Sequence, residues 1–350
     1  MSVPSTTVVV DRTTAPRDAA ADASRTMKAV VYDEYGSPDV LELRDVDRPV
    51  AGDDEVLVRV RAASANPADA FFMRGVPYVM RPTSGLRKPK NGILGRDVAG
   101  EVEVAGKDVT RFRPGDEVFA NVEEAGAFAE YARVPEGLLC AKPAGLTFAQ
   151  AAAIPLAALT ALQGLRGAGD VQPGQKVLIV GASGGVGTFA VQIAKALGAE
   201  VTGVCSTRNL ELVRSLGADH VIDYTETDFT EGAEKYDLIL QLAGTLSPSA
   251  CRRALTSKGR LVQSSGQTTH QWIGPMGRIA AAAVLSPFVS QKLGTFLMKP
   301  TRADMEFLLE LVEAGKLRPV VDRTYALADV PEAMRYVEAG HTQGKIVITV

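Results

Sequence analysis

The segment 177–193, VLIVGASGGVGTFAVQI, most strongly limits how this chain can fold, because an apolar β-branched strand passes through a glycine-rich turn directly into a helix. Gly181, Gly184 and Gly187 lack Cβ atoms, so the turn can tighten, the backbone can approach an anion, and the helix can pack closely on its strand. Unpaired N–H groups at the start of the helix favour negative charge. The spacing is GxxGxxG instead of the commoner GxGxxG, but its strand and helix context predicts a site for the diphosphate of a dinucleotide.

Composition indicates a globular chain of two domains. The 350 residues are 46% hydrophobic and 23% charged. The formal net charge is −3, and Arg and Lys are scattered among acidic residues, so no basic face for nucleic acid is expected. Cys140, Cys205 and Cys251 are too few and too far apart for a disulfide framework or a metal knuckle. They indicate buried thiols in a reducing cytoplasm.

The polar residues 1–26 predict a disordered tail. Their longest apolar run, 8–10, is too short for a secretory signal, and Asp11, Asp18 and Asp22 argue against a transit peptide because such peptides avoid acidic residues. The most apolar stretch, 279–285, has Pro287 nearby and is far shorter than the roughly 20 residues that span a bilayer. We therefore expect no transmembrane segment.

Short alternating apolar runs between Gly and Pro turns predict a compact, largely antiparallel β-barrel over residues 27–150. After Pro173 and Gly174, strand and helix patterns alternate, which predicts a parallel sheet. The expected organisation is a tail at 1–26, a first barrel part at 27–150, a nucleotide domain at 151–300 and a segment at 301–350 that returns to the barrel. The predicted strands are 27–32, 41–46, 56–63, 98–104, 117–119, 176–180, 200–204, 220–223, 238–242, 260–263, 320–326 and 345–350, and the predicted late helices are 304–313 and 330–338.

Further motifs over residues 27–350 match a known family. They are SANPADAFFMRG at 64–75, LGRDVAGEVEVAG at 94–106, RPGDEVFA, GAFAEYARVP, AAIPLAALTALQGL, the GASGGVG turn, LGADHVIDY and a terminal GKIVI. With them the chain resembles the zinc-independent, quinone oxidoreductase-like branch of the medium-chain dehydrogenase/reductase superfamily. The resemblance implies an α/β protein in which a GroES-like β-barrel, built from both chain ends, adjoins an inserted Rossmann domain with a doubly wound parallel sheet. It also implies NAD(P)H between the domains and a homodimer.

The resemblance assigns roles to individual residues. Thr160 is expected near the nicotinamide, and Asn66 and Lys345 match positions that border the nicotinamide pocket in similar proteins. Four residues of the turn, 184–187, are expected against the pyrophosphate. The predicted cofactor residues in and around this turn and after a later strand are Gly181, Ser183, Gly184, Gly185, Val186, Gly187, Ala243 and Gly244.

The sequence supplies no convincing set of metal ligands. A catalytic zinc requires three Cys, His or carboxylate ligands, and a structural zinc usually requires four cysteines. Where zinc-dependent relatives carry Gly-His-Glu this chain reads Gly-Arg-Asp at 95–97, and where they carry a ligand cysteine it reads Ala-Asn-Pro at 65–67. The four-cysteine lobe is missing at 119–127, and His220, His270 and His341 lie away from these positions. We predict no metal, and without a Lewis acid to activate an alcohol, reduction is the favoured direction.

The end of the second strand of the nucleotide domain distinguishes NADPH from NADH, because Asp or Glu there binds the ribose 2′-hydroxyl. This chain has Ser206, Thr207 and Arg208 instead, which offer hydroxyls and a guanidinium to a 2′-phosphate, and no carboxylate is expected nearby to repel it. Tyr224 ends the next strand and matches a residue that approaches the same phosphate in similar reductases. The alternatives are an N-cap role for Ser206 and a solvated Arg208. NADPH is the predicted cofactor.

The reaction that the resemblance implies is hydride transfer from NADPH to a quinone or to the β-carbon of an α,β-unsaturated ketone or aldehyde. Asn66 and Tyr78 are the candidate catalytic residues, because either could hydrogen-bond the acceptor carbonyl. The tyrosine found near the nicotinamide in some relatives is matched here by Phe71. The proton that completes the reduction can come from water. Two other functions stay open: a metal-free NADP-linked ketone or alcohol oxidoreductase, and a non-catalytic NADPH-binding sensor protein.

Several residues have simpler structural interpretations. Asp69 and Arg74 can fix the backbone of their own loop, and Arg96 with Asp97 can form a structural pair. Residues 271–300 resemble the substrate-side insertion of reductases related to the chloroplast-envelope quinone oxidoreductase. This segment could shape an apolar acceptor pocket, touch a membrane surface, form a dimer contact or pack as a buried helix. Its large apolar side chains are Trp272, Met276, Phe288, Phe296 and Met298.

Overall fold

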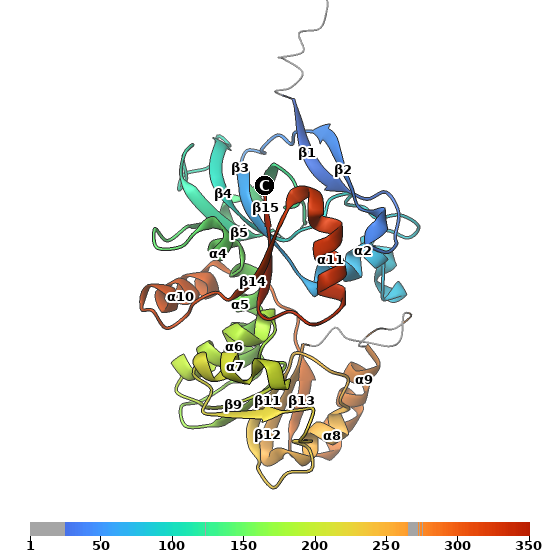
Figure 1. The fold of residues 1–350 in the computed structure, drawn as a ribbon, viewed down its shortest axis with the longest axis vertical. Coiled ribbons are helices and arrows are strands. Elements are labelled where there is room, and N and C mark those ends of the chain that lie inside the picture. Colours follow the sequence, from blue (N-terminus) through green and yellow to red (C-terminus); the bar gives the residue numbers. More distant parts are fainter. Residues whose placement is uncertain (1–24, 123, 265–271, 273, 275) are drawn as a thin grey trace, which may run out of the picture.

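Two sheets of different construction form the protein (Figure 1). The structure, a computed structural model, describes residues 25–122, 124–264, 272, 274 and 276–350. In Figure 1 the N-terminal strands, in blue, and the C-terminal segment, in red, share the upper half, and the parallel sheet fills the lower half. The predicted tail at 1–26 lies outside the described residues except for its last two, and Thr26 already begins a strand.

The barrel domain draws its strands from both ends of the chain. Its main sheet contains, in spatial order, β14 (Val321–Ala326), β15 (Lys345–Thr349), β3 (Glu55–Ala65), β4 (Asp97–Ala105), β5 (Glu117–Asn121) and β7 (Cys140–Ala141), with β6 (Tyr131–Pro135) also paired to β3. A separate antiparallel pair is formed by β1 (Thr26–Val31) and β2 (Glu42–Asp47). Neighbouring strands are antiparallel as predicted, except that β14 and β15 run parallel. The pairing of β15 with β3 sets the end of the chain beside residues 62–65.

The Rossmann domain has the strand order of a doubly wound sheet. In space, the strands are β10 (His220–Asp223), β9 (Glu200–Cys205), β8 (Lys176–Val180), β11 (Tyr236–Gln241), β12 (Leu255–Gln263) and β13 (Lys292–Thr295). Every neighbouring pair is parallel. The order reverses between β8 and β11, where ligands bind beyond the carboxyl ends of the strands in such sheets. The sequence does not predict β13, because KLGT is short and contains a glycine.

Helices cover the parallel sheet and join it to the barrel. The α-helices are α2 (Pro67–Arg74), α3 (Arg81–Ser84), α4 (Phe148–Ala152), α5 (Pro155–Leu162), α6 (Gly185–Ala196), α7 (Leu210–Ser215), α8 (Pro248–Arg253), α9 (Met276–Leu285), α10 (Arg302–Glu313) and α11 (Val330–Glu338). A π-helical segment, η4 (Gln163–Ala168), continues α5. The 3₁₀ turns are η1 (Pro38–Val40), η2 (Tyr78–Met80), η3 (Glu136–Leu138), η5 (Thr207–Asn209), η6 (Ser286–Phe288) and η7 (Leu327–Asp329). Within the described ranges, no helix is long and apolar enough to cross a membrane.

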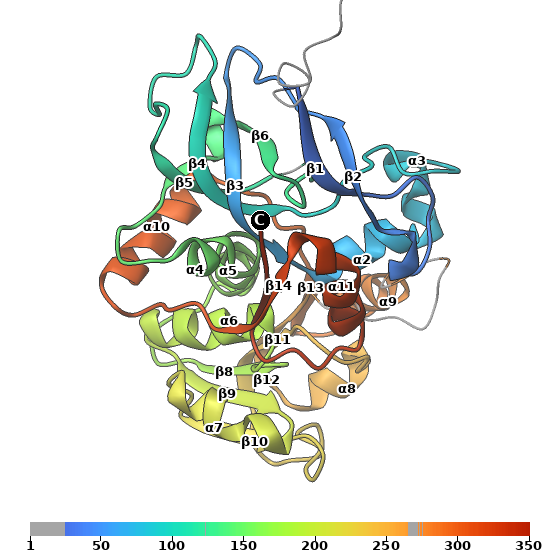
Figure 2. The same cartoon turned by 45° about the horizontal axis from the view of Figure 1, so that its top comes forward.

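One apolar core continues from the barrel through α5 and α6 into the parallel sheet. It contains Phe119 and Val347 of the barrel, Leu159 of α5, Phe189 of α6 and Ile179 of β8, all fully or almost fully buried. Figure 2 shows α5 and α6 between the barrel strands and the parallel sheet. Burial of each large side chain of this kind stabilises the fold by about 1.5–3 kcal/mol. The shared core fixes the two domains against one another, so polar groups at their boundary have defined neighbours.

Candidate cofactor and acceptor site

The glycine turn between β8 and α6 has the geometry of an anion cradle. Gly181 has a φ of 88°, which favours glycine, and a Cβ there would lie 2.7 Å from the Cβ of Ala243. A Cβ on Gly187 would lie 2.0 Å from the carbonyl oxygen of Gly181. Gly184 is the N-cap of α6, which has no acidic residue in its first turn. Glycine is thus required at the two tight positions, and the open N–H groups at the start of a 12-residue helix fit a diphosphate.

The carboxyl ends of neighbouring strands bring the other predicted cofactor residues to one edge of the sheet. Ser206 follows β9 and Tyr224 follows β10, and the register pairs Cys205 with Asp223, the last residues of these strands. Strands β8 and β11 are likewise paired up to their ends. The turns after β8 and β11 hold Gly181, Ser183, Ala243 and Gly244.

A buried asparagine supports the turn after β9. Asn209 is 4% exposed and donates from Nδ2 to Ser183 Oγ at 2.9 Å and to Ser206 Oγ at 3.2 Å. Its Oδ1 is buried without a hydrogen-bond partner in the part of the chain that the structure describes. Ser206 is the N-cap of η5 but makes no capping bond through its side chain. Arg208 donates from Nη2 to the carbonyl oxygen of His341 at 2.9 Å, which ties this turn to the loop before β15.

A carboxylate stands closer to the predicted 2′-phosphate site than the sequence suggests. Asp223 lies opposite Cys205, and its Oδ1 accepts from the N–H of Thr225 at 2.9 Å and from Thr225 Oγ1 at 2.7 Å. Hydrogen bonds from Thr207 and Thr225 lower the pKa of Asp223. Tyr224, which is 62% exposed, follows it directly. The expectation that no carboxylate lies nearby is wrong, because the pairing of β9 with β10 joins residues that are distant in the sequence.

The loop that precedes β15 lies on the glycine turn. Gly344 donates its N–H to the carbonyl oxygen of Ser183 at 2.9 Å, and Gly344 forms a parallel bridge with Gly184. The stem of Lys345 then passes the first turn of α6, since its Cδ would lie 3.0 Å from a Cβ placed on Gly185. The returning C-terminal segment therefore brings the predicted cofactor residue Lys345 to the predicted diphosphate site.

A buried carboxylate, Asp97, organises the polar groups where the barrel meets α5. It stands at the start of β4 and is fully buried. Its Oδ1 accepts from the N–H of Leu156 at 2.8 Å and from Asn121 Nδ2 at 3.1 Å. Its Oδ2 accepts from Ser64 Oγ at 2.7 Å and from Asn66 Nδ2 at 3.0 Å. Four donors from three separate segments, the end of β3, β5 and α5, thus match the acceptor capacity of one carboxylate.

Lys345 is the buried cation of the same cluster. It is 3% exposed, its Nζ donates to Asn66 Oδ1, and its Nζ lies 3.5 Å from Asp97 Oδ2. Burial lowers the pKa of Lys345, while the charges of Asp97 and Asp69 oppose that shift. Asn66 Nδ2 also donates to the carbonyl oxygen of Ser64 at 3.2 Å. The structure therefore places the candidate catalytic residue Asn66 in direct contact with Lys345.

Asp69 fixes backbone near this cluster, as its structural interpretation predicts. The residue is buried in α2, where its carboxylate accepts the N–H of Asn66 at 2.8 Å and the N–H of Gly95 at 3.2 Å. Burial raises the pKa of Asp69 to about 6. The two backbone donors hold the start of α2 against the strand that carries Asp97.

The two arginines near this cluster do not belong to it. The guanidinium of Arg96 lies 4.6 Å from the centre of the Phe72 ring, whereas Asp97 binds the donors described above. The expected pair of Arg96 with Asp97 does not form, because successive residues in extended chain point to opposite sides. Arg74 pairs with Glu338 of α11, with a distance of 2.7 Å from Nη2 to Oε2.

Thr160 lies one helical turn after the segment that Asp97 holds. It is 7% exposed, and its Oγ1 donates to the carbonyl oxygen of Leu156 at 2.7 Å. Because the N–H of Leu156 donates to Asp97, the position of Thr160 depends on the same carboxylate.

Tyr78, the second candidate catalytic residue, lies in η2 beside the 271–300 segment. Its ring meets that of Trp272 edge-on, with 5.2 Å between the ring centres, and the Arg81 guanidinium lies 4.5 Å from it. The N–H of Val79 donates to the carbonyl oxygen of Trp272 at 3.2 Å. Trp272 itself is 74% exposed. Residues 265–271, 273 and 275 lie outside the described residues, but this contact joins the segment to the barrel.

The donor set around Asp97 does not suit zinc. Among the residues that the structure describes, no group of three or more His, Cys, Asp or Glu side chains could hold a metal. The neighbours of Asp97 are amides, a hydroxyl and the ammonium of Lys345, whose charge at 3.5 Å would repel a divalent cation. His220, one of the three histidines, pairs with Glu200 at 3.3 Å.

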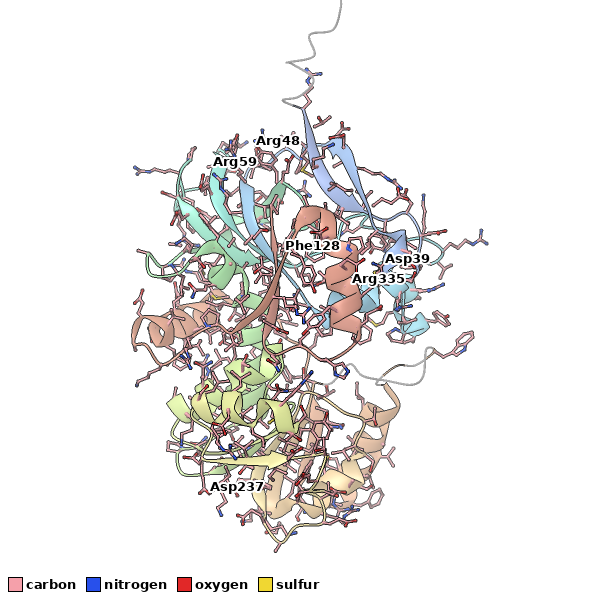
Figure 3. All side chains as sticks on the ribbon, viewed as in Figure 1. Asp39, Arg48, Arg59, Phe128, Asp237 and Arg335 are labelled. Carbon is pink, nitrogen blue, oxygen red and sulfur yellow. The ribbon has the colours of Figure 1, made fainter. Side chains whose placement is uncertain are left out.

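Two surface grooves lie apart from this site. One is lined by Arg48, Arg59 and Tyr131, and Figure 3 shows both arginines at the end of the barrel that faces away from the Rossmann domain. The other is lined by residues of α6 and α7 and by the turn after α10, including Lys195. Figure 3 also shows Arg335 of α11 beside Asp39, with which it forms an ion pair on the surface. None of these features includes a predicted site residue.

Three residues that the sequence does not assign to the candidate site contact its predicted members in the structure. The sequence indicates the role of Asn209 only weakly, since an amide three residues after Ser206 can reach back to that serine. Asp97 has a better signal in the sequence, because a carboxylate opens a strand of otherwise largely buried residues. Asp223 gave no signal, since its importance depends on which strand pairs with β9.

Comparisons with known proteins agree with this geometry. Residues 52–144 match the alcohol dehydrogenase GroES-like domain, residues 149–253 match the C-terminal domain of the alanine dehydrogenase/PNT family, and residues 216–348 match the zinc-binding dehydrogenase family.

Relatives match nearly the whole chain. The mouse (Mus musculus) mitochondrial NAD(P)H oxidoreductase RTN4IP1 is 38% identical, over 93% of this chain and 90% of that protein. The chloroplastic NADPH-dependent alkenal/one oxidoreductase of Arabidopsis thaliana is 36% identical, over 94% of this chain and 81% of that protein. The solved structure of the quinone oxidoreductase from Coxiella burnetii has a TM-score of 0.81 and 31% identity, and covers 93% of this chain and all of that one.

Proposed function

This chain belongs to the quinone oxidoreductase branch of the medium-chain dehydrogenase/reductase superfamily, and from that premise we propose that it is an NADPH-dependent reductase of quinones or of α,β-unsaturated ketones and aldehydes. The observation that carries the proposal is that Lys345 of the barrel crosses the glycine turn at Gly185 and ends at Asn66. A diphosphate cradle and a buried polar cluster thereby meet at one place, as a hydride-transfer site requires.

The residues at the carboxyl edge of the sheet fit the cofactor. NADPH, when bound, supplies a hydride from its dihydronicotinamide. The amides of Gly185, Val186 and Gly187, the first three residues of α6, would hold the diphosphate, and Ser206 and Arg208 would face the 2′-phosphate. The orphaned Oδ1 of the buried asparagine behind this turn supports a ligand there, because buried polar atoms are rarely left without a partner.

We further propose that the reaction needs no metal. The ammonium of Lys345 beside Asp97 supports this, because a divalent cation would have to displace it. An activated enone or quinone accepts a hydride without a Lewis acid, since the product anion is delocalised. Elemental analysis of active protein tests the proposal, and stoichiometric zinc together with loss of activity on chelation would contradict it.

We also propose that the protein is a homodimer and that it is cytoplasmic. Strand β13 is an edge of the parallel sheet, and Phe288 and Leu297 near its ends are each 83% exposed. An open strand edge with apolar neighbours favours pairing with a second copy. Size-exclusion chromatography with light scattering would return the dimer mass, and a monomer at micromolar concentration would contradict it. Subcellular fractionation tests the location.

Steady-state oxidation of NADPH with a panel of quinones, alkenals and enones tests the proposed reaction. We expect turnover on at least one class and little on saturated ketones or alcohols. Arg208→Ala should weaken NADPH binding more than NADH binding, whereas Arg214→Ala, which removes an exposed arginine paired with Glu211 on α7, should change neither. Tight NADPH binding without turnover on any acceptor would instead favour a sensor protein.

A further inference from the structure

Lys345 is a buried cation whose N–H groups are only partly accepted. One donates to Asn66 Oδ1, and Asp97 Oδ2 lies 3.5 Å away, beyond the usual N–H···O range of 2.7–3.2 Å. The third N–H of the Lys345 ammonium has no acceptor within the described parts of the chain. A buried donor without an acceptor is unfavourable, so this group is suited to a ligand that supplies an oxygen.

Asn66 cannot serve as that donor in this arrangement. Both hydrogens of its Nδ2 are engaged, by the carbonyl oxygen of Ser64 at 3.2 Å and by Asp97 Oδ2 at 3.0 Å. Its Oδ1 faces the ammonium of Lys345. The amide is therefore a bridge that orients Lys345 relative to Asp97, and the spare N–H of the cluster belongs to the lysine.

The location of this ammonium is also informative. Asn66 follows β3 and Asp97 begins β4, and the structure brings Asn66 Nδ2 to 3.0 Å from Asp97 Oδ2. The ammonium of Lys345 contacts both, while its stem lies at Gly185 of the diphosphate turn. A fixed positive charge thus lies between these two positions and the cofactor turn.

We propose that Lys345 is the proton donor of the reduction, with Asn66 and Asp97 as positioning residues. The proposal rests on the proposed function. A hydride adds to the β-carbon of an enone, the π electrons move to the carbonyl oxygen, and the Nζ–H bond breaks as a bond from hydrogen to that oxygen forms. A quinone gives a hydroquinone anion that takes the proton in the same way. The neutral amine then regains a proton from water.

The electrostatics of the cluster support this role. Burial lowers the pKa of Lys345, which brings a lysine nearer to the range where it can release a proton at neutral pH. Asp97 and Asp69, the charged groups of β4 and α2 that act on it, keep it protonated before the acceptor binds. Acid catalysis of this kind contributes typically 100- to 10,000-fold to a rate.

Substitutions at Lys345 separate proton donation from charge and from folding. Lys345→Met removes both the charge and the proton, and Lys345→Arg keeps the charge but holds its proton too tightly. Both should lower kcat for an enone by about 100-fold or more, with less than a tenfold change in the Kd for NADPH. With a tetrahalogenated quinone as acceptor, whose reduced anion is stable in water, the same substitutions should lower kcat far less. Lys142→Met is the matched control. The side chain of Lys142 is buried like that of Lys345 and pairs with a carboxylate, that of Glu117, but it lies outside the site.

Two further measurements test the proposal even if one of these variants folds poorly. Lys345→Ala should regain activity with added ethylamine, which a purely structural loss would not do. In the cofactor-free enzyme labelled with ¹⁵N-lysine, the signal of Lys345 is the one that Lys345→Arg removes. This signal should titrate at a lower pH than the signals of the other lysines. Asp97→Asn should lower the pKa of Lys345 further.

Each alternative outcome overturns the inference. A higher Kd for NADPH with unchanged kcat in Lys345→Met would make Lys345 a cofactor ligand only, and the proposed function would stand. Equal losses for the enone and the stable quinone, without rescue by ethylamine, would make it structural. Absence of turnover in the unmodified enzyme would remove both the proposed function and this inference.

Discussion

The glycine turn after β8 and the polar cluster around Asp97 are adjacent, but they are built in different ways. In the turn, the parts that meet an anion are main-chain N–H groups, and all of them come from one segment of the chain. In the cluster, side chains from β3, β5 and β15 and a backbone N–H of α5 meet on the buried carboxylate of Asp97 in β4. Lys345 is the physical link between the two regions.

This difference predicts how each region fails. A main-chain site is lost when added atoms block the backbone, so shape decides the outcome. A buried charged cluster is lost when one partner is removed, because the remaining charges and donors are left without compensation. Substitutions of each kind should therefore affect stability, pH dependence and cofactor affinity in different proportions.

Removal of the central carboxylate should have the largest effect. Asp97→Ala leaves Lys345 and four donors without their acceptor, and loss of one partner from a buried pair typically costs about 3–5 kcal/mol. Urea unfolding should report a loss of that size. Asp45→Ala, which breaks an exposed ion pair with Lys28, should cost less than about 1 kcal/mol. Equal losses in the two variants would show that the cluster is not a unit of stability.

The buried carboxyl of Asp69 should make stability depend on pH. Its folded-state pKa of about 6 lies above the ordinary value of 3.8, so the fold binds the proton more tightly than the unfolded chain. Its contribution is favourable below about pH 4 and is lost as pH rises to about 6, a change of about 3 kcal/mol. The free energy of unfolding relative to Asp69→Asn should fall by this amount between pH 4 and 7. A pH-independent difference would contradict the assignment.

Two alanine substitutions within the turn test whether shape decides the other region. Gly187→Ala places a methyl group 2.0 Å from the carbonyl oxygen of Gly181 and should cost about 1–3 kcal/mol and much of the affinity for NADPH. Gly184→Ala meets only that same oxygen at 3.5 Å, an ordinary contact, and its φ of −79° suits alanine. Calorimetry should show a larger rise in Kd for the first. The reverse order would refute the packing argument.

The smallest effect is expected at Asp223. Its charge lies near the predicted 2′-phosphate site, so Asp223→Asn should tighten NADPH binding by about two- to fivefold, as for an exposed charge interaction. NADH binding should change less, and added salt should reduce the gain because it screens exposed charges. Titrations of both cofactors at two salt concentrations measure this. An unchanged ratio of the two Kd values would place the 2′-phosphate elsewhere.

Much of the fold was accessible from sequence patterns, and the exceptions have physical causes. Strands β8 and β10 and helix α11 have their predicted limits, because each carries a local pattern: β8 is an apolar run, β10 is a short β-branched pair between polar residues, and α11 has its buried residues at helical spacing. Strand β13 escaped prediction because its four residues, KLGT, acquire strand character only from pairing with β12. The Arg96–Asp97 pair failed because proximity in sequence does not mean that two side chains share a face.

The sequence by itself determined the turn at 181–187, since glycine spacing, strand and helix are local and a main-chain site needs no distant partner. It also indicated that both chain ends contribute to one barrel. The tertiary structure alone decided that Asp97 gathers Ser64, Asn121 and the N–H of Leu156, and that Asp223 stands beside the turn after β9. Such contacts depend on strand register and pairing, and these are fixed by packing over the whole domain.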